Sequence, residues 1–68
     1  MEKEQIIQEI QDEIKLLEGL VKAFELLDSA DASTQRLATN RIALTTFEMV
    51  DSITKTEANI YNFMKGRE

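Results

Sequence analysis

The fold is decided by residues 7–24, which read IQEIQDEIKLLEGLVKAF. Large apolar side chains recur there at alternating spacings of three and four residues: Ile7, Ile10, Ile14, Leu17, Val21 and Phe24. This spacing keeps them on one face of an α-helix, whereas a β-strand would need an apolar residue at every second position. The stretch therefore predicts a long amphipathic helix over about residues 3–27, with this stripe facing a second helix.

The helical pattern breaks at residues 28–34, which read DSADAST. Ser, Asp and Thr side chains compete for backbone hydrogen bonds, which favours turns and helix caps over helix interiors. Ser29, Asp31 and Ser33 are each suited to cap the start of a following helix. We therefore predict a turn over about residues 28–33.

A second amphipathic pattern follows, and the chain contains no proline to interrupt it. Its apolar stripe, centred on Ile53, is formed by Ile42, Met49, Val50, Ile53, Ile60, Phe63 and Met64. Gly66 is a natural residue to follow the end of a helix, which we place over about residues 34–65. Because two helices joined by a short turn lie antiparallel, we predict an all-α fold, with residues 1–68 forming a single two-helix hairpin domain.

Both helices carry more apolar residues than one hairpin can bury. A single helical neighbour covers an arc of about 100°, yet the apolar arc widens to about 200° towards the turn. We assign the surplus to a partner or dimer interface that consists of Leu16, Leu20, Leu27, Leu37, Leu44 and Phe47. A chain of 68 residues has a marginal core, and without cysteine it cannot form a disulfide. We therefore expect a homodimer packed as a four-helix bundle, a different protein bound at the same surface, or both.

The charge of −5 is unevenly distributed along the chain. Residues 1–31 hold nine acidic and three basic side chains, whereas residues 32–68 hold four acidic and five basic ones. An acidic first helix repels nucleic-acid phosphates and anionic lipids, and it suits a basic protein surface. No apolar run is long enough to span a membrane, and no apolar segment of a signal peptide follows the start. We expect a cytoplasmic protein that binds neither nucleic acid nor membranes.

Catalytic chemistry finds little support in the composition. Without Cys and His, the chain lacks the commonest general base and the commonest transition-metal ligands, and it has no glycine-rich phosphate loop. Glu9 and Asp12 on the first helix and Glu48 and Asp51 on the second are expected at equal heights. This pairing resembles the Mg²⁺ sites of the all-α nucleotide pyrophosphatases. The resemblance covers these four residues, and Glu48 and Asp51 are expected to point away from the inner stripe.

The predicted function is that of a small non-enzymatic protein–protein interaction module without a cofactor. Such a module would act as an adaptor, a co-chaperone or an inhibitor or regulator of a larger protein, through its apolar patch near the turn and its acidic first helix. Its size is typical of small regulatory proteins of bacteria, plasmids or phages. The alternatives are a structural assembly subunit, an acidic DNA-mimic inhibitor and, most remotely, a Mg²⁺-dependent hydrolase like the pyrophosphatases.

Overall fold

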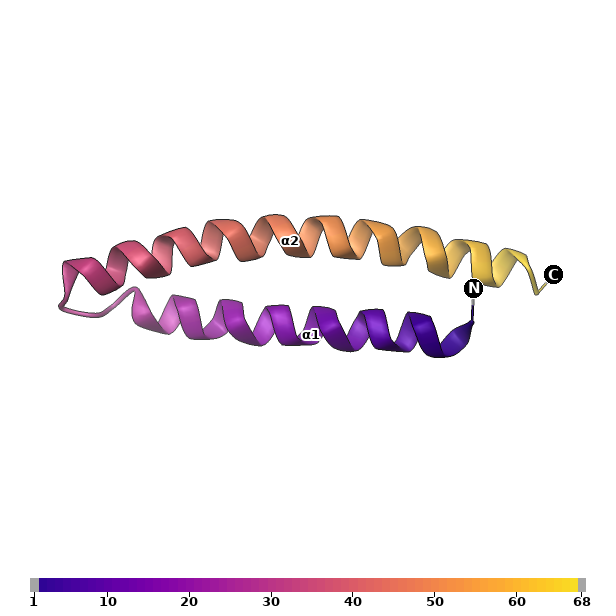
Figure 1. The fold of residues 1–68 in the computed structure, drawn as a ribbon, viewed down its shortest axis with the longest axis horizontal. Coiled ribbons are helices and arrows are strands. Elements are labelled where there is room, and N and C mark those ends of the chain that lie inside the picture. Colours follow the sequence, from indigo (N-terminus) through magenta and orange to yellow (C-terminus); the bar gives the residue numbers. More distant parts are fainter. Residues whose placement is uncertain (1, 68) are drawn as a thin grey trace.

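The computed structural model describes residues 2–67, which form two long helices side by side (Figure 1). Helix α1 spans Lys3–Leu26 and helix α2 spans Ala32–Lys65, and no strand occurs within the described residues. The predicted all-α helical hairpin is therefore confirmed, although the second helix begins two residues earlier than expected. The hairpin measures 55 × 16 × 11 Å, with its turn at one end and both ends of the chain at the other (Figure 1). Neither helix in this part of the chain is long and apolar enough to cross a membrane.

The turn is closed by side chains that bond to the backbone at the start of α2. Asp31 is the N-cap, and its carboxylate accepts hydrogen bonds from Ser33 N–H at 3.1 Å and Thr34 Oγ1 at 2.9 Å. Ser29 Oγ accepts a hydrogen bond from Asp31 N–H at 3.2 Å, and Gln35 Nε2 donates to the Ser29 carbonyl oxygen. Of the three predicted capping residues, Asp31 takes the role because its oxygens reach donors that the first turn leaves unpaired.

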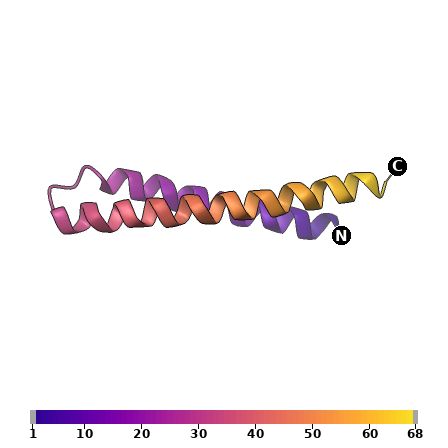
Figure 2. The ribbon, with the colours of Figure 1, turned by 90° about the horizontal axis from the view of Figure 1, so that it is seen from above.

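The helices meet along a row of buried and half-buried side chains, which we call the contact row. On α1 the contact row consists of Ile6, Glu9, Glu13, Leu16, Leu20, Ala23 and Leu27. On α2 it consists of Thr34, Ala38, Ile42, Thr45, Met49, Ser52, Thr56, Asn59 and Phe63. The spacing of three and four residues is that of a coiled coil, and the two helices cross at a shallow angle (Figure 2).

The most apolar stripe of α1 does not face α2, so the prediction that it packs inside the hairpin is wrong. Its six side chains are between 40% and 54% exposed: Ile7, Ile10, Ile14, Leu17, Val21 and Phe24. Each follows a contact-row residue by one position, which turns it about 100° away from α2. On α2 the predicted stripe is divided in the same way. Its members Ile42, Met49 and Phe63 lie in the contact row, whereas Val50, Ile53, Ile60 and Met64 are exposed.

The composition of the contact row explains this rotation. Near the turn, Ala23 and Ala38 are both buried, and small side chains let two helices approach closely. Towards the open end, Glu9 and Glu13 form hydrogen bonds with polar side chains of α2, which replaces an apolar contact. The helices therefore pack along a row in which small and polar residues alternate with large apolar ones.

The hairpin has only a small core of its own. No large side chain among the described residues is fully buried, and five residues fall in the buried class: Ile6, Ala23, Ala38, Thr45 and Thr56. Alanine and threonine bury little apolar area, and the stabilisation from burial scales with that area. A lone hairpin of this kind has little to offset the conformational entropy that two long helices lose on folding.

Candidate functional site

The hairpin has two broad faces, one on each side of the contact row. In two antiparallel helices, residues that follow the contact row by one position lie on one side, and residues that precede it by one lie on the other. A groove near the turn supports this geometry, because Lys22 and Leu26 of α1 border the same hollow as Leu37 and Arg41 of α2. All four precede a contact-row position by one residue. We call this side the grooved face.

The opposite side, which we call the apolar face, holds ten large apolar side chains: Ile7, Ile10, Ile14, Leu17, Val21, Phe24, Val50, Ile53, Ile60 and Met64. The four contributed by α2 are between 39% and 62% exposed, which is similar to the six contributed by α1. The α1 residues run from the open end almost to the turn, and the α2 residues cover the middle and the open end. A contiguous exposed group of this size on a small protein usually marks a contact site.

The total exposed area of the hairpin is larger than that of a compact protein of the same mass. The hairpin exposes 5479 Å². A compact protein of its mass, 7.8 kDa, exposes about 4,400 Å². The excess of roughly 1,100 Å² exceeds the area of about 800 Å² that each partner contributes to a typical stable protein–protein interface. The hairpin thus carries enough surplus surface for one complete interface.

The open half of the contact row is a hydrogen-bonded polar cluster between the helices. Asn59 Nδ2 donates to Glu9 at 2.8 Å from Oε1 and 3.1 Å from Oε2, and Ser52 Oγ donates to Glu13 Oε2 at 2.9 Å. Thr56 Oγ1 lies between the two carboxylates, 3.0 Å from Glu9 Oε2 and 2.5 Å from Glu13 Oε2. Its single proton can be donated to only one of them at a time.

This polar cluster fixes how the two helices align. Thr56 is only 4% exposed, and both carboxylates depend on donors from α2 because neither forms an ion pair in the described part of the chain. A shift of α2 along α1 by one heptad would put Met49 or Phe63 in place of Thr56, which removes a donor from two partly buried carboxylates and costs free energy. The cluster therefore provides register more than hydrophobic stability.

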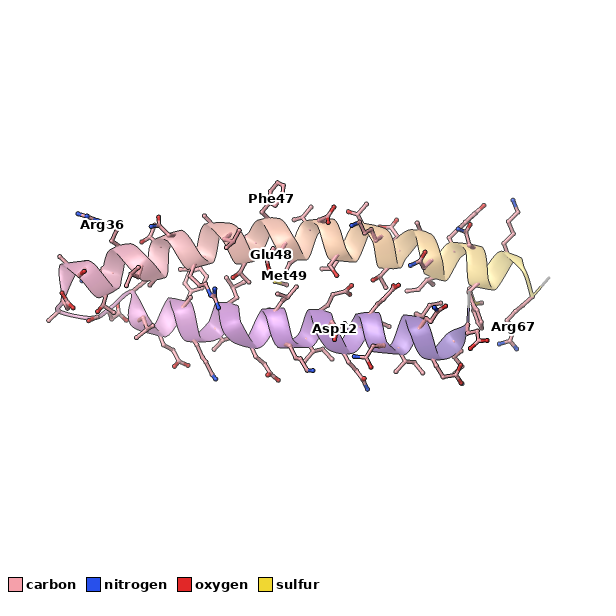
Figure 3. All side chains as sticks on the ribbon, viewed as in Figure 1. Asp12, Arg36, Phe47, Glu48, Met49 and Arg67 are labelled. Atoms are coloured by element: carbon pink, nitrogen blue, oxygen red, sulfur yellow. The ribbon has the colours of Figure 1, made fainter. Side chains whose placement is uncertain are left out.

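The six predicted interface residues do not form one patch. Leu16, Leu20 and Leu27 are half-buried in the contact row, and Leu37 and Leu44 are exposed on the grooved face. Phe47 is 75% exposed and points away from α1 (Figure 3). Sequence reasoning recorded the residues of the apolar face but assigned them to the inside of the hairpin. The signal that could have corrected this assignment is the polar Glu9–Glu13 and Ser52–Thr56–Asn59 spacing, which matches the contact row.

The groove on the grooved face is small and lined by mixed residues. It encloses about 430 Å³ and is lined by Gly19, Lys22, Ala23, Leu26, Thr34, Leu37, Ala38 and Arg41. Gly19 opens it, because a Cβ atom at this position would meet no atom within 4 Å. The two cations at its rim, Lys22 and Arg41, distinguish this end of the grooved face from the acidic remainder of α1.

Three of the four acidic residues that resemble a Mg²⁺ site have separate partners. Glu9 is bonded to Thr56 and Asn59, Asp12 accepts a hydrogen bond from Gln8 Nε2 at 3.0 Å, and Asp51 pairs with Lys55 at 3.1 Å. Within residues 2–67, no group of three or more acidic side chains is arranged to hold a metal ion.

Comparisons of the chain with protein families, with curated proteins and with solved structures give no match. The class of the protein is therefore defined by its own architecture, an all-α two-helix hairpin. Its distinguishing surface is the apolar face, and its distinguishing internal feature is the polar cluster of the contact row.

Proposed function

We propose that this chain is a non-enzymatic protein–protein interaction module that works through its apolar face. The observation that carries the proposal is the exposure of ten large apolar side chains on one side of a hairpin whose own core is small. Apolar area gains free energy when it leaves water, and a second helical surface offers the most regular way to cover a flat, two-helix face. The adaptor or regulator role and the cytoplasmic location inferred from the sequence stay predictions.

The partner that we propose for this face is a second copy of the chain, which gives a four-helix bundle. Helices in such bundles contact two neighbours, so each needs an apolar arc wider than one hairpin partner requires. On α1 the contact row and the apolar face together provide that arc, from Leu20 through Ile6 to Ile7. On α2 the arc runs from Phe63 through Ile60 to Val50. The homodimer expected from the sequence is thus retained, but with its interface moved to the apolar face.

A matched pair of substitutions on α2 tests which face binds. Ile53 on the apolar face and Leu44 on the grooved face have similar exposures, 46% and 52%. We expect Ile53→Glu to weaken self-association by about a thousandfold or more, because an unpaired charge buried at an interface costs several kcal/mol. We expect Leu44→Glu to leave association almost unchanged. Sedimentation velocity measures both, with circular dichroism to check helical content.

The reverse result would contradict the proposal. If Leu44→Glu separates the subunits while Ile53→Glu does not, the interface lies on the grooved face, where Leu37 and Leu44 were first assigned to it. Ile53→Glu also tests the earlier expectation that this residue is central to the inside of the hairpin. Its exposure predicts that the variant keeps its helices whenever they are stable without the partner.

A further inference from the structure

The two outer edges of the apolar face differ in charge, and this difference bears on how two copies would pair. The outer edge of α1 is formed by Glu4, Gln11, Glu18 and Glu25, all of which are exposed. They repeat every seven residues, so they share one side of the helix, one turn before Ile7, Ile14 and Val21. Three of the four are carboxylates, and none is basic.

The outer edge of α2 has no carboxylate. Its exposed residues are Arg36, Asn40, Phe47, Thr54 and Tyr61. They share one side of α2 because they are separated by seven or four residues. Glu57 is the nearest acidic side chain, and it lies further in, between Ile53 and Ile60 on the apolar face itself. Phe47 and Tyr61 add exposed aromatic area at this edge, 75% and 65% of each residue.

Two copies can pair their apolar faces with two-fold symmetry in two ways. If the symmetry axis runs along the bundle, both turns lie at the same end and α1 packs beside α2 of the partner. If the axis runs across the bundle, the turns lie at opposite ends and α1 packs beside α1 of the partner. The two arrangements bury the same apolar face but bring different outer edges together.

We propose that the second copy docks with both turns at the same end, so that the acidic edge of each α1 meets the basic and aromatic edge of the partner's α2. Glu25 and Arg36 both lie near the turn (Figure 1). This arrangement therefore brings opposite charges to the same height at the turn end of the bundle, and it places no acidic edge against another. The other arrangement sets two acidic edges side by side, and like charges disfavour a contact. The inference rests on the proposed self-association.

Distances between the two turns distinguish the arrangements. The chain has no cysteine, so Ala30→Cys in the turn and Asn62→Cys near the open end each give one spin-label site per chain. Both residues are exposed, and Asn62 precedes the contact-row residue Phe63, so it lies on the grooved face. Double electron–electron resonance on each labelled dimer then measures the separation between the two copies of one site. Circular dichroism and sedimentation confirm that each labelled variant stays helical and associated.

With the turns at the same end, both sites give separations under about 30 Å, because neighbouring helix axes in a bundle lie about 8–10 Å apart. Separations of about 45 Å or more at both sites would overturn the inference while leaving self-association intact. That longer value approaches the 55 Å length of the hairpin. A labelled protein that sediments as a monomer and shows no dipolar coupling would overturn the proposed self-association itself, so the two failures are distinguishable.

Discussion

At the scale of single residues, Thr56 has the most constrained environment in the hairpin. It is almost completely buried, and its hydroxyl lies within hydrogen-bonding distance of Glu9 and Glu13. Ser52 and Asn59 supply the remaining donors to these carboxylates. A threonine would be a weak choice for an apolar core, but here it serves as a donor between two acceptors.

We predict that Thr56→Val destabilises the hairpin by about 1–3 kcal/mol, because it removes a donor from two partly buried carboxylates while keeping the side-chain shape. Thermal or urea unfolding followed by circular dichroism measures the change. Glu13→Gln is the control, since an uncharged amide oxygen still accepts from Ser52 and the repulsion from Glu9 disappears. An unchanged stability in Thr56→Val would mean that water replaces the hydroxyl and that the cluster does not set the register.

A second prediction at this scale concerns Gly19 in the middle of α1. The space around it is empty, and no special backbone conformation is required of it. Gly19→Ala should therefore stabilise the helix by about 0.5–1 kcal/mol, by reducing the conformational entropy of the unfolded chain. The measurement is again the unfolding transition. A destabilised variant would indicate that the groove is occupied when the protein is folded, because the added methyl group would then meet another atom.

At the scale of the elements, α1 and α2 differ in how well their sequences suit a helix. The α2 sequence contains several threonines, which are poor helix formers. Three of them, Thr39, Thr46 and Thr54, donate their hydroxyl protons to the carbonyl oxygens four residues earlier at 2.7–2.9 Å. These bonds satisfy the hydroxyls locally but add little to helix stability. A helix of 34 residues with this composition therefore depends on packing against its neighbours.

The start of α2 gives a prediction for the dependence of stability on pH. Hydrogen bonds from the Thr34 hydroxyl and from the Ser33 N–H lower the pKa of Asp31 below its ordinary value. A carboxyl whose pKa is lower in the folded state stabilises that state above its unfolded pKa, and this contribution is lost as the pH falls through the folded pKa. Wild type should therefore lose more stability than Asp31→Asn when the pH is lowered below about 4.

Asparagine caps helices about as well as aspartate but does not titrate in this range, so it is the matched control at neutral pH. Melting temperatures of the two proteins across the acidic range measure the difference. Parallel acid profiles for wild type and Asp31→Asn would show that the cap makes no pH-dependent contribution. Asp31→Ala should lower the melting temperature at neutral pH, because it leaves the first N–H groups of α2 without a side-chain acceptor.

The elements themselves could be predicted from the sequence, but their rotation about their own axes could not. The apolar periodicity defined both helices, and the cluster of Ser, Asp and Thr residues located the turn to within about two residues. The same periodicity led to Ile53 being placed inside the hairpin, although it is exposed. An apolar arc that is wide enough for two neighbours does not say which half meets which neighbour. The decision rests on pairwise bonds such as Glu13 to Thr56, which a spacing rule does not record.

The six residues of the predicted interface lie on different surfaces for the same reason. Leu16, Leu20 and Leu27 looked surplus only while the neighbouring stripe was assumed to face inward, and the structure has them half-buried in the contact row. What the sequence did indicate is the amount of apolar surface, which exceeds what one hairpin can cover. The location of that surplus became visible only with the contact row in place.

At the scale of the whole molecule, a small core and a large apolar face together imply that folding and association are coupled. The described hairpin has five buried residues and ten exposed apolar ones on a single face. If a second copy covers that face, mass action stabilises the folded state as concentration rises. We therefore predict a melting temperature that increases with protein concentration. A melting temperature that is constant over a hundredfold range of concentration would instead describe a hairpin that folds alone.

The most direct test of the central claim is the mass of the protein in solution, measured by sedimentation equilibrium at micromolar concentration. If the apolar face is a protein-binding surface that a second copy covers, the measured mass is twice the chain mass of 7.8 kDa. The dimer should also persist at high salt, since burial of apolar area is not screened. A single species at the chain mass, with a sharp and concentration-independent unfolding transition, would contradict the account.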